Sequence, residues 1–181
     1  MVEGKILALI SGGIDSAVAA YMAGVEGKFE VCALHFNVKP YIGEEETVKP
    51  YRLCLKLKEI IPLKKLYVVP HGENLAKIVS TCNRKLTCIL CKRLMLRVAS
   101  RIAAEEGASA LVTGDSLGQV ASQTLANLRV EDKASTIPIL RPLLGLNKNE
   151  IASVARRIGT YEVSASKPQT CRAAPKNPAT K

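Results

Sequence analysis

The sequence has only two histidines, His35 and His71, and it has no long hydrophobic run, repeat or low-complexity tract. A metal site built from histidines is therefore not expected. The first apolar run, Lys5 to Ile10, is much shorter than the roughly 20 residues that cross a membrane, and it leads directly into a glycine-rich turn. We interpret these first residues as neither a signal peptide nor a membrane anchor. The protein is expected to be cytoplasmic.

Acidic residues are also scarce, with 16 Asp and Glu against 26 Lys and Arg and a net charge of +10. This excess favours a polyanionic partner, either nucleotide or nucleic acid, although a basic surface can also be merely solvated. The 181 residues, 48% of them hydrophobic, suffice for one folded domain with its own core. Six cysteines in a reducing compartment are interpreted as core residues, metal ligands or redox groups rather than as a disulfide framework.

The stretch Ser11-Gly12-Gly13-Ile14-Asp15-Ser16 lies between an apolar strand-like run and an alanine-rich helix-like run, Ala17 to Val25. Two glycines at a strand-to-helix turn let the backbone approach an anion, and the amides and dipole of the following helix favour negative charge there. An ordinary turn that needs glycine for its dihedral angles is the alternative. Because hydroxyls flank the glycines and an acid lies within the turn, the stretch predicts a phosphate site.

Strand-like and helix-like runs alternate along the whole chain, which predicts a doubly wound α/β fold with about five mostly parallel strands and helices on both faces. Residues 1–163 are expected to form this domain, and residues 164–181 an extended tail that carries Cys171. The strands are predicted at 5–10, 29–36, 66–69, 110–112 and 137–140. The helices are predicted at 17–25, at 48–61 after a start with the three glutamates that follow Gly43 in its first turn, from Asn74, after Cys91 up to Gly107, and from Asn147 to Gly159.

The second strand ends in His35, Phe36 and Asn37. Since the carboxyl ends of parallel strands line the ligand crevice, His35 and Phe36 are expected beside Ser11. We interpret them as a wall for an adenine ring, with a merely packed strand end as the alternative.

Arg93, Arg97 and Arg101 recur every four residues on the long helix, away from its apolar positions. Such a row is typical of a solvated helix face, but it could equally present a surface to nucleic acid.

Cys88 and Cys91 form a single C-x-x-C placed just before the predicted long helix. One such motif is compatible with half of a zinc site, a redox pair or two core thiols. Cys32 lies in a strand and Cys54 in a helix, so both are interpreted as packing residues.

The order S-G-G-x-D-S resembles the pyrophosphatase loop, or PP-loop, of enzymes that split ATP between its α and β phosphates. In that family the Ser-Gly-Gly backbone holds the leaving pyrophosphate and the acid assists magnesium. The resemblance carries over to Ser11, Gly12, Gly13, Asp15 and Ser16.

A second resemblance is more specific. The runs VTGDSLGQVASQTLANL from Val112 to Leu128, CKRLMLRVASRIA and the tail CRAAPKNPATK are similar to the catalytic domain of tRNA 4-thiouridine synthetases, also called tRNA sulfurtransferases. The likeness runs from about Lys5 to the C-terminus, and the chain resembles a short, stand-alone form without a THUMP or rhodanese domain.

In that family, ATP is contacted by the end of the strand before the loop, the end of the second strand, a basic residue before the long helix, and the T-G and Q of the motif TGxxLGQxxSQT. The resemblance places the corresponding contacts in this chain. These positions are Leu9, Ile10, His35, Phe36, Lys92, Gly114 and Gln123. The residue types suit the role: Lys92 would offset phosphate charge, Gly114 would permit close approach of the nucleotide, and Gln123 would hydrogen-bond it. Gln123 could instead be a merely exposed position on a helix.

Cys171 matches the cysteine that the family uses in sulfur transfer. With Cys88 and Cys91 it also resembles the three thiolates of iron–sulfur-dependent tRNA thiolation enzymes, where one iron stays open for sulfide. Cys82 could replace any of the three cysteines. The alternatives to a cluster are a persulfide on Cys171 without metal, a structural zinc that needs one more ligand, and plain core thiols.

The resemblance implies an enzyme that uses ATP and Mg²⁺ to adenylate a uridine of tRNA and then replaces its oxygen by sulfur, giving 4-thiouridine. Asp15 and Cys171 would be the catalytic residues. The implied partners are tRNA and a sulfur donor, either sulfide or a persulfide carrier, and no membrane; a homodimer and a separate tRNA-binding chain stay open. The rival functions are a PP-loop ligase that uses ammonia and a catalytically silent nucleotide-binding subunit.

Overall fold

The computed structural model describes residues 3–117, 123–165 and 170–180. Within this part of the chain, five strands form one parallel sheet in the order β3-β2-β1-β4-β5. The strands are β1 (Lys5–Leu9), β2 (Glu30–Asn37), β3 (Leu63–Pro70), β4 (Ala110–Val112) and β5 (Ile139–Leu140). The predicted α/β fold with about five parallel strands is confirmed.

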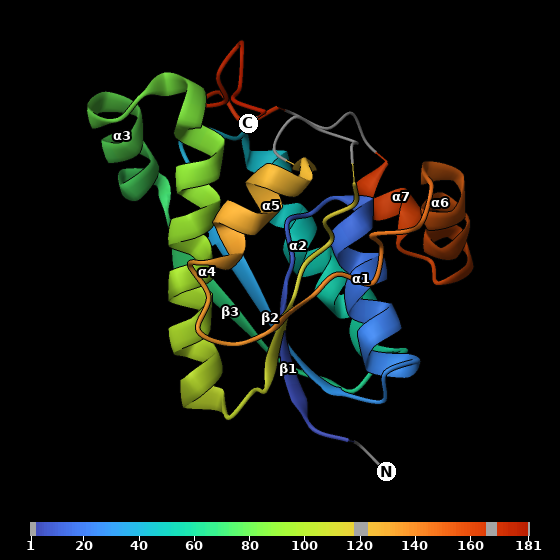
Figure 1. Ribbon diagram of the computed structural model, residues 1–181. Coiled ribbons are helices and arrows are strands. Elements are labelled where there is room, and N and C mark those ends of the chain that lie inside the picture. Colours follow the sequence, from blue (N-terminus) through green and yellow to red (C-terminus); the bar gives the residue numbers. More distant parts are fainter. Residues whose placement is uncertain (1–2, 118–122, 166–169, 181) are drawn as a thin grey trace.

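Helices cover both faces of the sheet (Figure 1). The helices are α1 (Ile14–Val25), α2 (Glu44–Lys58), α3 (Gly72–Thr81), η1 (Arg84–Leu86), α4 (Thr87–Glu106), α5 (Leu125–Asp132), α6 (Lys148–Arg157) and α7 (Tyr161–Ser164). Alternate residues of β1 show the two layers: Ile6 and Ala8 pack with α1, α2 and α6, whereas Leu7 packs with α4. The central apolar strands β1 and β2 are thus buried on both faces, as is typical of a parallel sheet.

The strand order reverses beside β1, because β2 and β3 lie on one side of it and β4 and β5 on the other. Such a switch point opens a crevice at the carboxyl ends of the strands. The turn from β1 into α1, which contains Ser11 to Ser16, lies at this point. The crossover helices α1 and α4 meet this edge of the sheet with their amino-terminal ends.

Several predicted boundaries are wrong, and packing explains the differences. The three glutamates after Gly43 lie in the first turn of α2, as predicted, but the helix then continues through Pro50, whose buried ring lies against Gly12. Strand β3 begins at Leu63 because it pairs with β2 along its length, and its exposed Lys64 and Lys65 belong to a sheet edge.

The later elements also differ from prediction. Helix α4 begins at Thr87, so Cys88, Cys91 and Lys92 lie in its first two turns and not before it. Strand β5 is shorter than predicted, and α3 starts at Gly72 after His71. The last predicted helix is confirmed, because the Asn147 side chain caps α6 and Gly159 follows its end with φ +72°; α7 is a separate short helix beyond it. The motif run from Val112 to Leu128 lies partly outside the described residues.

Candidate active site

The turn between β1 and α1 is held by its own hydroxyls. Ser16 Oγ donates to the Gly13 carbonyl at 2.9 Å and accepts from the Ser11 amide at 3.2 Å. Gly12 has φ +92°, a conformation that other residues rarely adopt. Gly13 precedes α1 without any side-chain cap. The amino end of α1 is therefore available to an anion, as the sequence pattern predicts.

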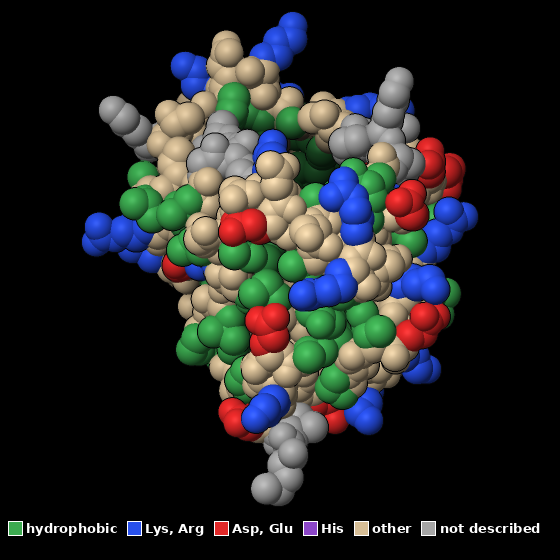
Figure 2. Space-filling view, turned by 90° about the vertical axis from the view of Figure 1, so that its right-hand side faces the viewer, with side chains coloured by type: hydrophobic (Ala, Val, Ile, Leu, Met, Phe, Trp, Pro, Cys, Tyr) green, Lys and Arg blue, Asp and Glu red, His purple; other side chains and the backbone are tan. Residues whose placement is uncertain are grey.

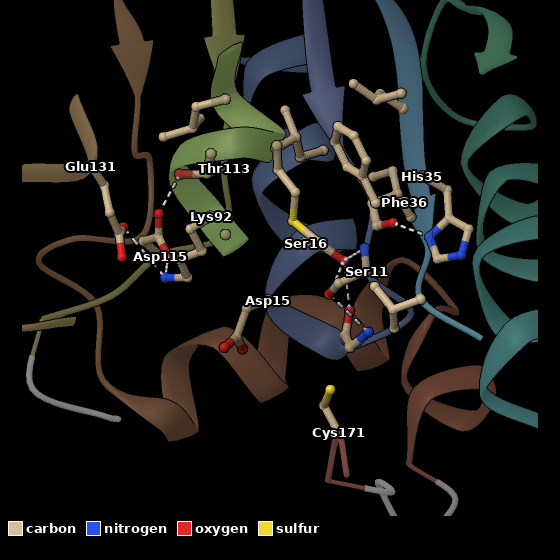
Figure 3. A pocket seen from close by; sticks show the side chains of 18 of the residues that line it. Ser11, Asp15, Ser16, His35, Phe36, Lys92, Thr113, Asp115, Glu131 and Cys171 are labelled. Carbon is tan, nitrogen blue, oxygen red and sulfur yellow. Dashed lines mark hydrogen bonds and ion pairs between the residues drawn. The ribbon is translucent and has the colours of Figure 1, made fainter. Parts of the chain in front are cut away.

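A cavity of about 440 Å³ opens beside this turn, at the carboxyl ends of β1, β2 and β4 (Figure 3). Gly114 closes one wall, since a Cβ there would stand 2.7 Å from the Ser16 amide nitrogen. In space-filling view a hollow opens at the top of the face shown, with Lys and Arg side chains beside it (Figure 2). The volume suits a small ligand.

Most of the predicted site residues line this one cavity. They are Leu9, Ile10, Ser11, Gly13, Asp15, Ser16, His35, Phe36, Lys92, Gly114, Gln123 and Cys171. Gly12 shapes the turn without lining the cavity, and Cys88 and Cys91 do not line it either. Gln123 is buried and precedes α5, so its interpretation as an exposed helix position is wrong.

The end of β2 forms an apolar wall. His35 is buried, and its Nδ1 lies 2.9 Å from the Ile10 carbonyl. Burial lowers the pKa of His35, which favours a neutral ring that donates from Nδ1. Phe36 meets the ring of His71 edge-on with centroids 5.5 Å apart. These rings are fixed, and Phe36 can offer an apolar surface to a base.

Charged residues form the opposite wall (Figure 3). Lys92 Nζ lies 3.0 Å from Asp115 Oδ1 and 3.5 Å from Glu131 Oε2. Asp115 also accepts from Thr113 at 2.8 Å and faces Arg141 at 3.4 Å. Oxygen Oε1 of Glu131 is buried and has no partner among the described residues. This wall therefore contains a buried carboxylate oxygen whose hydrogen-bonding capacity is unused among the described residues.

Burial and neighbouring charges shift the pKa values of the three acids at the site in different directions. Burial raises the pKa of Glu131 to about 7, against the opposing effect of Lys92. Burial would also raise the pKa of Asp115, but Lys92, Thr113 and Arg141 together lower it. The pKa of Asp15 is raised by burial, partly offset by the charge of Lys148.

Three thiols come together beside the cavity. Cys88 and Cys91 share the first turns of α4, and both lie close enough to Cys171 for their thiolates to repel. Cys91 Sγ contacts His71 Nε2 at 3.3 Å, and burial raises the pKa of Cys91 to about 12. The Cys171 thiol points toward the Ser11 turn (Figure 3). Among the described residues, no group of three or more Cys, His, Asp or Glu is arranged to hold a metal ion.

Sequence reasoning missed Asp115, Glu131 and Lys148 as site residues. Asp115 follows Thr113-Gly114 at the end of β4, so its position at a strand end could have indicated a role. Glu131 carries no such signal, because it reaches the cavity only through the packing of α5. Exposed Lys148, at the start of α6, does not line the cavity, but its charge acts on Asp15. The buried Cys32 and Cys54 lie in β2 and α2, as predicted, while Cys82 is exposed.

The parallel sheet, the turn at its switch point and the cavity beside it define the PP-loop, adenine nucleotide alpha hydrolase-like class of α/β proteins. The profile of the family described as "Thiamine biosynthesis protein (ThiI)" matches residues 1–181. The chain therefore belongs to this family, and its resemblance to tRNA sulfurtransferases is confirmed.

Individual relatives agree with this assignment. The chain is 41% identical over 181 residues to a "Probable tRNA sulfurtransferase" of Methanosarcina mazei, covering 99% of the chain and 44% of the relative. It is 44% identical over 182 residues to one of Thermus thermophilus, covering 99% and 45%. It also matches a crystal structure of a 4-thiouridine synthetase–RNA complex with bound ATP, with a TM-score of 0.91 and 38% identity over 99% of the chain and 48% of that protein. The chain thus spans less than half the length of these relatives.

Proposed function

We propose that this chain carries the catalytic centre of an ATP-dependent tRNA sulfurtransferase, which adenylates a uridine of tRNA and replaces its O4 by sulfur. The observation that carries the proposal is the position of the Cys171 thiol in the wall of the cavity that also contains the Ser11–Ser16 turn. A sulfur-bearing group and a phosphate site can act on one base only if they share one chamber. The ATP and RNA held by the 38% identical 4-thiouridine synthetase support both ligands.

The cavity has two chemically different sides, which orient ATP. The apolar side at Phe36 suits the adenine ring, and the amino end of α1 suits the phosphates. Lys148 adds a cation near Asp15 on the phosphate side. In this orientation the α phosphate would lie near Asp15, and a uridine would enter the remaining space of the cavity next to it.

Asp15 and the hydroxyl of Ser11 are oxygen donors of the kind that Mg²⁺ prefers, and Asp15 lines the cavity. Asp15 would therefore hold this ion. A bound Mg²⁺ neutralises charge on the phosphates during transfer.

In the first step, uridine O4 attacks the α phosphorus of ATP and the bond to the β-phosphate oxygen breaks. The amides at the start of α1 hold the departing pyrophosphate. The adenylated base then carries AMP as a leaving group at C4.

In the second step, the terminal sulfur of a persulfide on Cys171 attacks C4 and AMP leaves. A neighbouring thiol then attacks the Cys171 sulfur of the mixed disulfide, which leaves sulfur on the base and a disulfide in the protein. Cys88 and Cys91 both interact electrostatically with Cys171, and we assign the resolving role to Cys88, because burial raises the pKa of Cys91 to about 12 and leaves little of its nucleophilic thiolate. The cycle consumes one persulfide from a sulfur donor, and a dithiol reductant restores the two thiols.

The three cysteines do not form a preformed metal site among the described residues. No step above passes through an iron–sulfur cluster, and the cluster hypothesis is decided by iron content. Thiolation by protein that is purified without oxygen and carries no iron would support the persulfide route. Brown, iron-containing protein that loses both iron and activity on Cys88→Ser would replace the persulfide route by the cluster route.

The activity itself is tested by incubating the protein with ATP, Mg²⁺, unmodified tRNA and a persulfide donor. Pyrophosphate should appear only when tRNA is present, and 4-thiouridine should appear in the digested tRNA. ATP binding without either product would identify a nucleotide-binding subunit and contradict the proposed enzyme.

A further inference from the structure

The positive charge of this chain is concentrated in two segments. Residues 74–104 contain seven Lys and Arg, and residues 163–181 contain four, with no Asp or Glu in either segment. The rest of the chain has 15 basic and 16 acidic residues. These two segments therefore account for the whole net charge, although they lie far apart in the sequence.

The fold brings the two segments together beside the cavity. The amide of Ala179 donates to the Lys85 carbonyl at 3.0 Å, and Asn127 of α5 donates to the Ala179 carbonyl at 2.9 Å. Cys88 and Cys171 lie close together, one from each segment. In Figure 1 the tail lies at the same end of the molecule as the start of α4. These hydrogen bonds hold the described part of the tail against η1 and α5.

Four exposed basic residues stand on these joined segments, Arg84 and Lys85 in η1 and Arg172 and Lys176 in the tail. We call this set the basic rim. None of the four forms an ion pair with a described residue, whereas Lys5, Lys65 and Lys92 do. Their charges are consequently available to an outside anion.

The arginine row that the sequence singles out lies elsewhere. Arg93 donates to the Val130 carbonyl of α5, so it is engaged within the protein. Arg97 and Arg101 follow on α4, and Arg101 lies 14 residues beyond Thr87, which is about 21 Å along a helix. The row therefore runs away from the cavity, toward the opposite edge of the sheet.

We propose that the basic rim binds the phosphate backbone of RNA and guides the target base into the cavity. This inference rests on the proposed function and adds where the RNA lies. An RNA partner fits better than an acidic protein, because protein interfaces have an apolar centre and nucleic-acid interfaces are polar and positively charged. None of the exposed large hydrophobic residues among those described lies in η1, in the first two turns of α4 or in residues 170–180.

The test compares two double variants with the same loss of charge, Arg84→Ala/Lys85→Ala in the rim and Arg97→Ala/Arg101→Ala in the row. The affinity of each protein for unmodified tRNA is measured over a range of salt concentrations, and ATP binding is measured alongside. Each lost phosphate contact lowers the slope of log affinity against log salt by about 0.9. The rim variant should lose a slope of up to about 1.8 and at least roughly tenfold in affinity at 0.1 M salt.

The row variant should bind tRNA like the wild type, and both variants should bind ATP normally. The single variant Lys176→Ala should lose about half as much slope as the rim double variant, which tests the tail separately. Equal losses in the rim and row variants would overturn the inference, because net charge alone would then explain binding. Normal tRNA binding by the rim variant, with slower transfer from a protein sulfur donor, would also overturn it and assign the rim to an acidic protein.

The inference and the proposed function fail separately. Wild-type protein that binds tRNA through the rim without forming 4-thiouridine would sustain the rim and refute the enzyme. If the wild type thiolates tRNA while the rim and row variants bind tRNA equally well, the proposed enzyme is supported and the role of the basic rim is refuted.

Discussion

Two carboxylate clusters lie at opposite ends of the parallel strands. We call the side of the sheet where the strands begin its amino edge and the side where they end its carboxyl edge. At the amino edge, Glu106 at the end of α4 accepts from Lys5 at 3.2 Å and Lys65 at 2.8 Å, and it also contacts Tyr67. At the carboxyl edge, Asp115 and Glu131 share Lys92 in the wall of the cavity. The residue types are nearly the same in both clusters.

The clusters differ in how completely their oxygens are satisfied. Hydrogen bonds from Lys65, Tyr67 and Lys5 lower the pKa of Glu106 to about 2. Burial raises the pKa of Glu131 to about 7, and its Oε1 has no partner among the described residues. The satisfied cluster of Glu106 joins β1, β3 and α4. The incompletely hydrogen-bonded cluster costs stability, and we interpret this cost as a sign of a binding site. The following predictions test this contrast, beginning with the carboxyl edge.

The largest effect is expected for Cys171→Ser. It should abolish 4-thiouridine formation while tRNA-dependent pyrophosphate release continues, because sulfur transfer follows adenylation. The thiol lies in the cavity wall and is half-buried, so the fold should persist. Cys54→Ser is the matched control, since that buried thiol is distant from the chemistry, and it should cost only stability. Continued thiolation by the Cys171 variant would refute both versions of the sulfur chemistry.

Asp15→Asn should slow pyrophosphate release by roughly 10²- to 10³-fold, the usual loss when one charge-stabilising group is removed. The substitution preserves shape and removes a carboxylate that burial already makes costly to ionise. The thermal midpoint should therefore not fall. Pyrophosphate release at the wild-type rate would remove Asp15 from the mechanism.

Glu106→Gln should lower the melting temperature at neutral pH without changing ATP affinity. The folded pKa of about 2 lies below the ordinary value of 4.5, so ionised Glu106 stabilises the fold above about pH 4.5. This contribution is lost as the pH falls toward 2. Melting curves of the variant and the wild type should therefore converge in acid, and a constant difference at every pH would contradict the role of the charge.

Glu131→Gln should have the smallest effect and the opposite sign. Its folded pKa of about 7 lies above the ordinary 4.5, so the stability of the wild type declines as the pH rises between these values. The variant escapes this decline and should melt a few degrees higher at pH 8, with the difference vanishing below about pH 4.5. A lower melting temperature at pH 8 would show that the pair with Lys92 stabilises the fold and would remove the contrast between the two edges.

Much of the site was predictable because its residues are either contiguous in the sequence or lie at the ends of strands. Ser11 to Ser16 are contiguous, and strand ends such as His35, Phe36 and Gly114 meet at one edge of any parallel sheet. Boundaries that depend on distant partners were not predictable. Pro50 lies within α2, and the start of α4 at Thr87 places Cys88, Cys91 and Lys92 inside a helix.

The sequence alone determined the parallel α/β fold, the glycine-rich turn from Ser11 to Ser16 and the family, because alternating apolar runs and contiguous motifs express local preferences. Only the tertiary structure decided that Glu131 enters the cavity, that Cys171 lies near Cys88, and that the tail runs along η1. Each of these depends on how helices and the tail pack over residues far away in the chain. Short-range patterns carry no information about such contacts, so charge and thiols scattered along the sequence become a site only when the chain is folded.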